Sequence, residues 1–383
     1  MASLPSIVHI LYAGVGGEAG VVFPLASAAA AQSRQHAIFY GIEPVAEANI
    51  RRCEELNITW HGVRKSPGLD QRSQQEITRL LLEIKPVAVI VHTLGTLPAC
   101  LKAKRKLPRL RIIAVEHHSN ALKSTKRWLL SFIALWRADR VVYLTEAYRQ
   151  EVADKLRSLF SLRSRRTIVI GNSLNLAHYQ PATTRAQDRF VFGMQGRMVE
   201  GKDFAILLRA LVTVSEQCPV PLHLELIGDG PLRLDLEALA LELGIADRVT
   251  FCGMLSTSDL IARMRKWHAY VHASLGETMS IAIMEAKACG LAIIATEAPG
   301  VSGFFQNGHN GLVVPAGDAH ALAQHLCELQ RRPELRQCLG EAARLEAEDC
   351  YSSREAWQAY AQLFVEPEIS PLLPLESIHQ LPV

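Results

Sequence analysis

The chain has 383 residues, 49% of them hydrophobic and 21% charged, which is enough apolar sequence for more than one globular core. No run of eighteen apolar residues occurs and no basic-plus-apolar leader is present, so we expect neither a membrane-spanning helix nor a signal peptide. The eight cysteines form no Cys-X-X-Cys pair, which argues against a structural zinc site. Scattered cysteines of this kind are typical of a reducing compartment, and we expect a cytoplasmic protein.

The net charge of +3 conceals a split between the two halves. Residues 1–180 contain 25 Lys and Arg against 13 Asp and Glu, whereas residues 181–383 contain 16 against 25. Such asymmetry indicates an anionic partner for the first half. Because no helix-turn-helix or aromatic-basic recognition motif is present, we expect no nucleic acid as partner.

Two segments concentrate the basic residues of the first half. One extends from Lys102 to Arg111 and the other from Lys123 to Arg137, where the charges flank an apolar run beginning at Trp128. Basic residues around a tryptophan-bearing apolar helix are typical of a protein that rests on an anionic membrane. The same pattern fits a core helix with solvated charges, so the sequence leaves both readings open.

In chain order, the first half alternates strand-like and helix-like segments. The expected helices lie at residues 20–33, 45–56 and 71–84. The expected strands lie at residues 7–12, 37–40, 87–92, 111–116, 140–144 and 167–170. This alternation predicts a parallel sheet covered by helices on both faces.

The second half repeats the pattern after a polar linker at residues 178–188. The expected strands lie at residues 190–193, 223–227, 249–251, 269–272 and 292–295. We therefore predict an α/β protein with two Rossmann-like, doubly wound parallel-sheet domains at residues 1–180 and 181–351. Residues 352–383 should form a helix that packs back toward the first domain, followed by an irregular tail.

Two glutamates stand eight residues apart in the second half. Glu277 follows a buried strand, and Glu285 lies on a helix expected at residues 280–289. Eight residues are a little over two helical turns, so both carboxylates can face one crevice. A helix N-terminus suits a phosphate, and a carboxylate beside it suits the hydroxyls of a ribose or a sugar. The alternative is two surface glutamates on an amphipathic helix.

Three glycine-containing loops accompany this pair, each after an expected strand. They are Gly-Val-Gly-Gly-Glu-Ala-Gly at residues 14–20, Gly-Arg-Met-Val-Glu-Gly-Lys at 196–202 and Gly-Asp-Gly-Pro at 228–231. In this order, and over roughly residues 7–364, the chain resembles the family-4 retaining glycosyltransferases. The resemblance implies the GT-B fold, with the donor bound on the second domain, the acceptor on the first and a central cleft between them.

The family places an Arg and a Lys, spaced as Arg197 and Lys202 are here, at the donor diphosphate. Cations there stabilise the charge that grows as the glycosidic bond breaks. Arg binds two phosphate oxygens at once, whereas Lys acts as a point charge. Taken alone, the segment also fits a solvated basic turn. No Asp-X-Asp motif, the metal clamp of the other large glycosyltransferase fold, occurs in the chain. We therefore expect no metal and no cofactor.

The resemblance places Glu277 beside the donor sugar and Glu285 on the ribose. Relatives often have Gly-Phe-Gly after the first glutamate, where this chain has Thr-Met-Ser, and a glutamate common in relatives is replaced by Gly303. These departures leave the donor open. The residues expected to bind the donor are Gly16, Gly17, Arg197, Lys202, Gly230, Met254, Leu255, Glu277, Thr278, Met279, Ser280, Ile281 and Glu285.

Gly16 and Gly17 match the paired glycines of the family's first loop, which let backbone N–H groups approach a ligand. The same loop meets the looser dinucleotide-binding pattern through Gly14, Gly16 and Ala19. The acidic ribose ligand of that pattern should close the second strand, but Glu43 comes slightly late, so a dinucleotide site is the less favoured alternative.

His117 and His118 end an expected strand where the family has a histidine near the donor sugar. We favour His117 for this role, with His118 nearly equivalent and His92 a further candidate for the cleft. Ordinary core or loop histidines are the alternative. Together with Glu277, Arg197 and Lys202, His117 and His118 complete the expected catalytic set.

The resemblance implies a metal-independent retaining transfer of a sugar from a nucleotide sugar, UDP-sugar first among them, to a hydroxyl acceptor. A lipid-linked, lipopolysaccharide or other glycan acceptor is expected, with the protein in the cytoplasm or on the inner face of the membrane. The alternatives are a nucleotide-sugar epimerase, a phosphorylase, and a catalytically inactive nucleotide-sugar-binding subunit.

Overall fold

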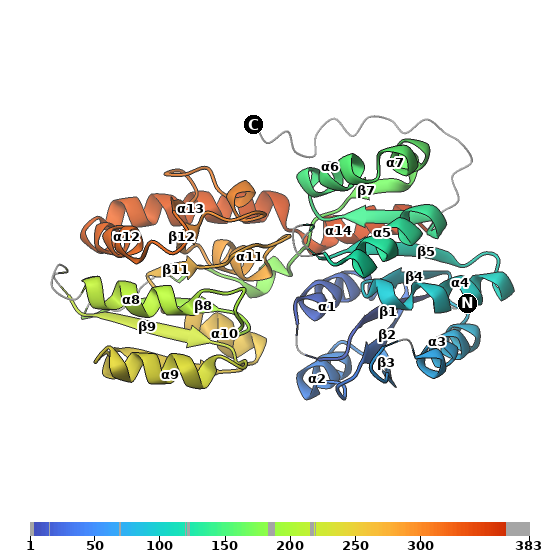
Figure 1. The fold of residues 1–383 in the computed structure, drawn as a ribbon, viewed down its shortest axis with the longest axis horizontal. Coiled ribbons are helices and arrows are strands. Elements are labelled where there is room, and N and C mark those ends of the chain that lie inside the picture. Colours follow the sequence, from blue (N-terminus) through green and yellow to red (C-terminus); the bar gives the residue numbers. More distant parts are fainter. Residues whose placement is uncertain are drawn as a thin grey trace.

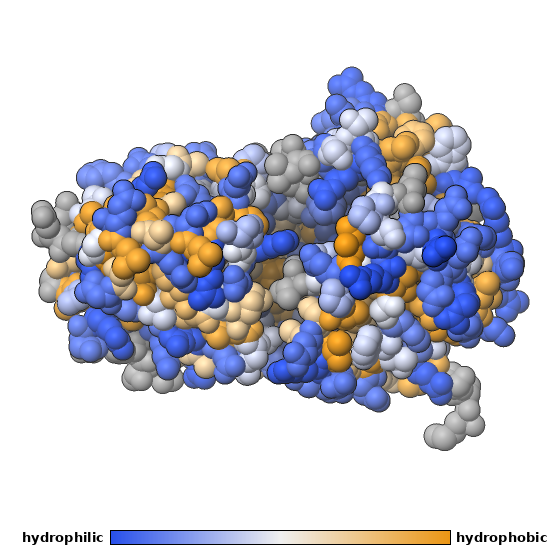
Figure 2. Space-filling model, turned by 60° about the horizontal axis from the view of Figure 1, so that its bottom comes forward, coloured by the Kyte–Doolittle hydropathy of each residue, from blue (hydrophilic) through white to orange (hydrophobic). Residues whose placement is uncertain are grey.

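The computed structural model describes residues 4–14, 16–68, 70–118, 120, 123–182, 188–214, 218 and 220–364. Two parallel-sheet domains lie side by side, with helices packed against their sheets (Figure 1). Apolar clusters fill the space between sheets and helices. The space-filling view shows two lobes with a hollow between them (Figure 2). No helix in the described ranges is long and apolar enough to cross a membrane.

The first domain contains a seven-stranded parallel sheet in the order β3-β2-β1-β4-β5-β6-β7. Its strands are β1 Ser6–Tyr12, β2 Arg34–Gly41, β3 Thr59–Arg64, β4 Ala88–Val91, β5 Arg111–Glu116, β6 Arg140–Tyr143 and β7 Thr167–Val169. Its helices are α1 Gly17–Ala29, α2 Glu47–Glu55, α3 Gln71–Ile84, α4 Leu97–Lys106, α5 Thr125–Arg137, α6 Glu146–Lys155 and α7 Arg157–Arg163.

The second domain contains a six-stranded parallel sheet in the order β10-β9-β8-β11-β12-β13. Its strands are β8 Phe190–Gln195, β9 Leu222–Ile227, β10 Val249–Gly253, β11 Ala269–His272, β12 Ala292–Thr296 and β13 Leu312–Val314. The helices that follow the linker are α8 Phe204–Val214, α9 Arg233–Glu242, α10 Thr257–Met264, α11 Ile281–Ala288, α12 Ala319–Arg331, α13 Pro333–Cys350 and α14 Ser353–Gln362. Short 3₁₀ turns lie at Leu94–Thr96, Ser164–Arg166, Leu176–His178, Ala246–Arg248 and Ser302–Phe304.

Strand order determines where a ligand crevice forms. In the first sheet β1 lies between β2 and β4, and in the second β8 lies between β9 and β11, so the order reverses at these strands. Loops that leave the carboxyl ends of strands at such a point diverge and leave a crevice. The loops after β1, β4, β8 and β11 are therefore the ones that the topology offers to ligands.

Most of the expected strands are confirmed to within two or three residues, and the helix at residues 71–84 and the strand at 111–116 match their expected bounds. Two strands were missed. β3 is an edge strand in which only Val63 is buried, and β13 has three residues, so neither gives a long apolar run. Helix α1 begins at Gly17 rather than at residue 20. The prediction missed this first turn because it contains Gly17 and Gly20, and glycine has a poor helix propensity.

The two segments that cross between the domains lie side by side. Leu174 and Ser352 form a parallel bridge, supported by a 2.8 Å bond from the Leu174 N–H to the Tyr351 carbonyl. Beyond this bridge, α14 packs against α1 of the first domain (Figure 1). The Trp357 indole N–H donates to Gln32 Oε1 at 2.9 Å, which connects α14 to the turn after α1.

Candidate active site

An ion pair occupies the crevice of the second domain. Lys202, in the loop after β8, contacts Glu277 Oε1 in the loop after β11, and His272 Nε2 lies 3.1 Å from the same oxygen. The two charged side chains are 20% and 17% exposed. Burial lowers the pKa of Lys202 to about 8, so the ammonium form still predominates at neutral pH. The structure thus brings together two of the predicted catalytic residues.

His272 was missed by the sequence analysis, although its position as the last residue of a buried strand offered a signal. It is fully buried, and desolvation, helped by the charge of Lys202, holds its pKa well below the usual range. The neutral ring donates from Nε2 to Glu277 Oε1, and its Nδ1 accepts from the Tyr270 hydroxyl, 3.2 Å away. His272 therefore positions the Glu277 carboxylate without adding charge.

Arg197 is exposed in the loop after β8, on the side of the first domain. Its charge acts on Tyr12, whose pKa is raised chiefly by a 2.5 Å hydrogen bond to Glu43 and lowered in part by Arg197. Arg197 and Lys202 therefore lie in one loop but in different surroundings. Lys202 is half-buried against a carboxylate, whereas Arg197 faces the opposite domain.

Glycines let the loops of this crevice approach each other closely. A Cβ on Gly230, whose φ is +159°, would lie 2.4 Å from the Met198 carbonyl oxygen, and one on Gly300, at φ +76°, would lie 1.8 Å from the Glu277 carbonyl oxygen. Neither contact is tolerable for any other residue. Gly230, in the loop after β9, thus packs against the loop that contains Arg197. This packing role is separate from the donor contact predicted for Gly230.

The glycine pair of the first domain lies at the start of α1. Gly16 is the N-cap of that helix in an extended conformation. A Cβ on Gly17 would meet no atom within 4 Å among the described residues, and one on Gly16 would meet only the Tyr12 ring at 3.7 Å. The pair therefore leaves open space beside a helix N-terminus, as an anionic ligand requires.

Glu285 lies on α11 and is buried. The Tyr179 hydroxyl donates to its Oε1 at 2.7 Å, and the Gln195 amide donates to its Oε2. Burial raises the pKa of Glu285, and the two hydrogen bonds act in the opposite direction. Each oxygen thus has one protein partner, which leaves acceptor capacity for a hydroxyl because a carboxylate offers about four lone-pair sites. Neither partner was expected from the sequence.

The residues between the two glutamates form the contact between the domains. Thr278 Oγ1 donates to the His117 carbonyl oxygen at 2.7 Å, and the Asn172 amide donates to the Met279 carbonyl oxygen at 2.9 Å. Ser280 is the N-cap of α11. Ile281, the first residue of that helix, packs against the apolar cluster of the first domain. The run that departs from the family pattern is therefore placed at the interdomain contact.

Met254 and Leu255 follow β10, which is separated from β11 in the sheet by β9 and β8. Met254 is exposed, whereas Leu255 packs against the apolar cluster under α11. No bond between these two residues and the ion pair is found in the described part of the chain, so their donor role stays a prediction.

His117 and His118 occupy different surroundings. His117 Nε2 lies 2.9 Å from His92 Nδ1, and its backbone contacts Thr278 of the second domain. His118 is exposed, with its carbonyl oxygen bound by the Tyr148 hydroxyl. Burial lowers the pKa of His117 to about 3 and that of His118 to about 4, in the second case with help from nearby cations. Only His117 is bonded to the loop that contains Glu277.

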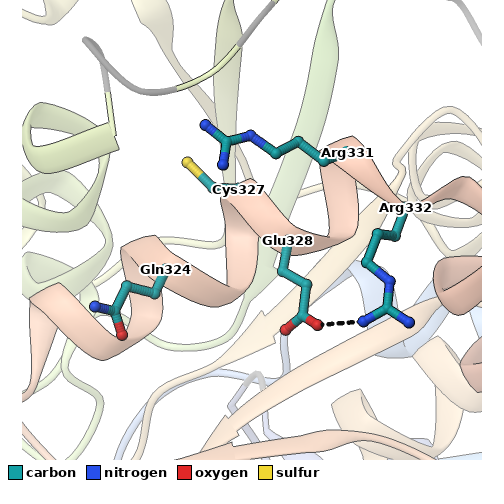
Figure 3. A pocket seen from close by; sticks show the side chains of 5 residues that line it. All are labelled: Gln324, Cys327, Glu328, Arg331 and Arg332. Atoms are coloured by element: carbon teal, nitrogen blue, oxygen red, sulfur yellow. Dashed lines mark hydrogen bonds and ion pairs between the residues drawn. The ribbon is translucent and has the colours of Figure 1, made fainter.

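A separate depression of about 420 Å³ lies on α12 (Figure 3). Its lining consists of Gln324, Cys327, Glu328, Arg331 and Arg332. Arg332 Nη1 and Glu328 Oε1 are paired at 2.8 Å, and the helix lies at the outer end of the second domain (Figures 1 and 3). This depression is remote from the loops at the carboxyl ends of β8 and β11. Among the described residues, no group of three or more His, Cys, Asp or Glu is arranged to hold a metal ion.

Comparison with known proteins gives two adjoining family matches. Residues 15–178 match the model of glycosyltransferase family 4, and residues 178–346 match that of glycosyl transferases group 1. The lipopolysaccharide core biosynthesis glycosyltransferase LpsD of Rhizobium meliloti is 31% identical over 205 residues, 52% of this chain and 58% of the relative. A D-inositol 3-phosphate glycosyltransferase of Streptomyces bingchenggensis is 29% identical over 228 residues, 55% of this chain and 49% of the relative. The matched segments thus span about half the length of these relatives.

Solved structures agree over nearly the whole chain. Alr3699/HepE of Anabaena, in complex with UDP and glucose, superposes with a TM-score of 0.77 at 20% identity and covers 94% of this chain and 98% of its own. TarM of S. aureus gives a TM-score of 0.78 at 12% identity and covers 95% of this chain and all of its own. At such identities the likeness concerns the fold. The chain belongs to the family-4 glycosyltransferases, and its two facing Rossmann-like domains have the GT-B fold.

Proposed function

We propose that this protein is a retaining, metal-independent glycosyltransferase that moves a sugar from a nucleotide sugar to a hydroxyl of a glycan or lipid-linked acceptor. The observation that supports it most is the half-buried Lys202–Glu277 pair at the reversal point of the second sheet, with Arg197 in the same loop. Cations in a partly desolvated crevice stabilise a departing diphosphate far better than they would in water.

The proposed roles follow from the surroundings of each side chain. Lys202 and Arg197 neutralise the diphosphate, and the N-terminus of α11 adds partial positive charge. Glu277, held by Lys202 and His272, accepts hydrogen bonds from hydroxyls of the donor sugar. Glu285 uses its remaining acceptor capacity on the ribose. The transition state has oxocarbenium character at the sugar, and water is excluded when the domains close.

UDP-sugars are the first donors to test, because Alr3699/HepE binds UDP and UDP-glucose in the same fold. A lipopolysaccharide or other glycan acceptor is supported by the likeness to LpsD. For this chain, both identities are proposals that need direct measurement.

The basic half of the chain suits an acceptor presented at an anionic membrane. On α5, Leu129 and Trp136 are 57% and 48% exposed, with Lys126 and Arg137 exposed beside them. We define these four residues as the α5 surface. An apolar pair among cations fits the interfacial zone of an anionic bilayer. Lys102 on α4 and Arg109 in the turn that follows it are further exposed basic residues of the first domain.

Lys123 does not belong to this surface, although it begins the segment from Lys123 to Arg137 for which the sequence left membrane contact and a core helix both open. Its side chain is 1% exposed and forms a 2.8 Å ion pair with the equally buried Glu116. The ammonium also lies 4.8 Å from the Trp128 ring centre. Lys104 is likewise paired, with its Nζ 2.5 Å from Asp139 Oδ2. Basic sequence alone does not separate such structural cations from solvated ones.

The test is release of nucleoside diphosphate from UDP-, GDP- and ADP-sugars by the purified protein in EDTA, with and without glycan acceptors. We expect release from one class of donor, faster with acceptor, and a product that keeps the anomeric configuration of the donor. Turnover that requires inorganic phosphate would indicate a phosphorylase, and an epimerised sugar product an epimerase. Donor binding without any release would indicate a binding subunit.

A further inference from the structure

Three histidine rings form a hydrogen-bonded row across the first sheet. His9 Nδ1 lies 3.2 Å from His92 Nε2, and His92 Nδ1 lies 2.9 Å from His117 Nε2. The residues come from β1, from the end of β4 and from the end of β5, which are neighbours in the sheet. At the far end, His9 Nε2 lies 3.1 Å from Gln35 Oε1 on β2. His9, His92 and Gln35 are all buried.

The orientation of the Gln35 amide is determined by Ser33. The Ser33 hydroxyl lies 3.3 Å from the Ala29 carbonyl oxygen, which can only accept, so the hydroxyl hydrogen points there. The Ser33 oxygen is then left to accept from the Gln35 amide nitrogen, 2.7 Å away. With Ser33 donating to Ala29, the Gln35 amide presents its oxygen, an acceptor, to His9.

This acceptor determines the proton position on every ring in the row, because a neutral imidazole has one N–H and one lone pair. His9 holds its hydrogen on Nε2 and accepts through Nδ1 from His92. His92 in turn accepts through Nδ1 from His117. Burial supports neutral rings, since it lowers the pKa of His9 to about 4 and that of His117 to about 3.

We propose that Gln35, His9 and His92 are positioning residues that hold His117 in its Nε2–H tautomer, so that His117 Nδ1 accepts a hydrogen bond from a hydroxyl of the bound sugar. His117 Nδ1 has no hydrogen-bond partner in the part of the chain that the structure describes, and the ring is half-buried. The 2.7 Å bond from Thr278 to the His117 backbone places the ring beside the loop of Glu277. The sugar part of this inference rests on the proposed function, whereas the tautomer does not.

The tautomer is measured directly by long-range ¹H–¹⁵N NMR on protein with ¹⁵N-labelled histidine, with His117 assigned through the His117→Gln variant. We expect His117 to be protonated on Nε2 alone. Protonation on Nδ1 would overturn the proposal, whether or not the protein transfers a sugar. The wild-type protein suffices for this experiment.

Two variants test whether Gln35 determines the tautomer of His117. Gln35→Met removes the acceptor, and Ser33→Ala lets the amide rotate with little change in packing, so both should mix the two tautomers of His117. We expect kcat to fall about tenfold in Gln35→Met, the lower end of the scale found when a metal-ligating histidine loses its orienting partner, with a smaller fall in Ser33→Ala. The donor KM should change little in both.

The matched control is Gln330→Met in the second domain, which removes a similarly buried amide that donates to the Val220 carbonyl oxygen. It should leave both the His117 spectrum and kcat unchanged. An unaltered His117 tautomer in Gln35→Met and Ser33→Ala would refute the proposal that the row determines this tautomer. If the wild type shows the expected tautomer but transfers no sugar, the proposed function fails and the row stands.

Discussion

Lys202 is a lysine in the ligand crevice whose environment differs from that of an ordinary surface lysine. It is half-buried, pairs with Glu277, and has a pKa lowered to about 8 by burial. A cation with this pKa is charged at neutral pH and becomes neutral in mildly alkaline solution. The proposed role at the diphosphate therefore makes a prediction about pH.

We predict that kcat/KM for the donor falls as pH rises through about 8, because the ammonium is lost from the free enzyme. Stability should move the other way. The folded pKa lies below the usual 10.5, so the unfolded chain binds the Lys202 proton more tightly, and the contribution of Lys202 to the free energy of unfolding rises between pH 8 and 10.5. Initial rates and urea unfolding across this range measure both.

The test variant is Lys202→Met. Its matched control is Lys266→Met, which replaces an exposed lysine of the same domain. Lys202→Met should lose about 10²-fold in kcat/KM, the scale for removing one group that stabilises the transition-state charge, and should also lose the alkaline fall. A flat profile in the wild type, or an equal loss in Lys266→Met, would contradict the cation role.

A second prediction at this scale concerns Lys123. Lys123→Met leaves the Glu116 carboxylate buried without its partner, so we expect the free energy of unfolding to fall by about 3–5 kcal/mol. Lys126→Met, at an exposed position three residues on, should change it by less than about 0.5 kcal/mol. Urea denaturation compares the two variants, and equal small effects would show that Lys123 is a surface charge after all.

Among the elements, α5 combines a buried face with an exposed apolar one. Ser131, Ala134 and Leu135 pack inward, whereas Leu129 and Trp136 face solvent. The sequence predicted a helix-like apolar run there but left its partner open, because periodicity shows which residues share a face and not what covers that face. The structure shows that the four residues of the α5 surface are exposed, whereas the Lys123 side chain is buried.

We predict that the purified protein binds vesicles with anionic lipids and not neutral ones, through the α5 surface. The double variant Leu129→Ser/Trp136→Ser should lose most of this binding while its fold is kept, because both positions are exposed. Leu345→Ser on α13, 61% exposed in the other domain, is the control. Co-sedimentation at low and moderate salt measures the effect, and equal binding by the double variant would exclude this surface.

At the scale of the whole molecule, sequence reasoning succeeded where apolar runs and glycine loops are long. β5 and α3 match their expected bounds, whereas the strand order that produces the two reversal points comes from the structure. Sequence reasoning failed where a residue acts through a distant partner. Tyr179 and Gln195 meet Glu285 across 106 and 90 residues, and the histidine row with Gln35 connects four strands, so no local sequence pattern predicts either arrangement. The edge strands β3 and β13 lack the apolar length that the prediction requires.

Two crevices, one at β1 and β4 and one at β8 and β11, face a common hollow, and two short crossing segments join the domains. The contacts of Thr278 with His117 and of Met279 with Asn172 link the loop of Glu277 directly to the first domain. A ligand bound by Lys202 and Glu277 therefore lies within reach of both domains. The proposed transfer depends on this arrangement, and it requires first that the protein binds a nucleotide.

The most direct test is a thermal-shift titration of the wild type and Lys202→Met with UDP-, GDP- and ADP-sugars and with the free nucleotides. A ligand that binds only the folded state stabilises it by about 2.7 kcal/mol at 100 times its Kd. We predict a clear rise in Tm of the wild type with one class of nucleotide and a much smaller rise in Lys202→Met. No rise with any nucleotide at millimolar concentration, or the same rise in both proteins, would contradict the donor site at Lys202 and Glu277.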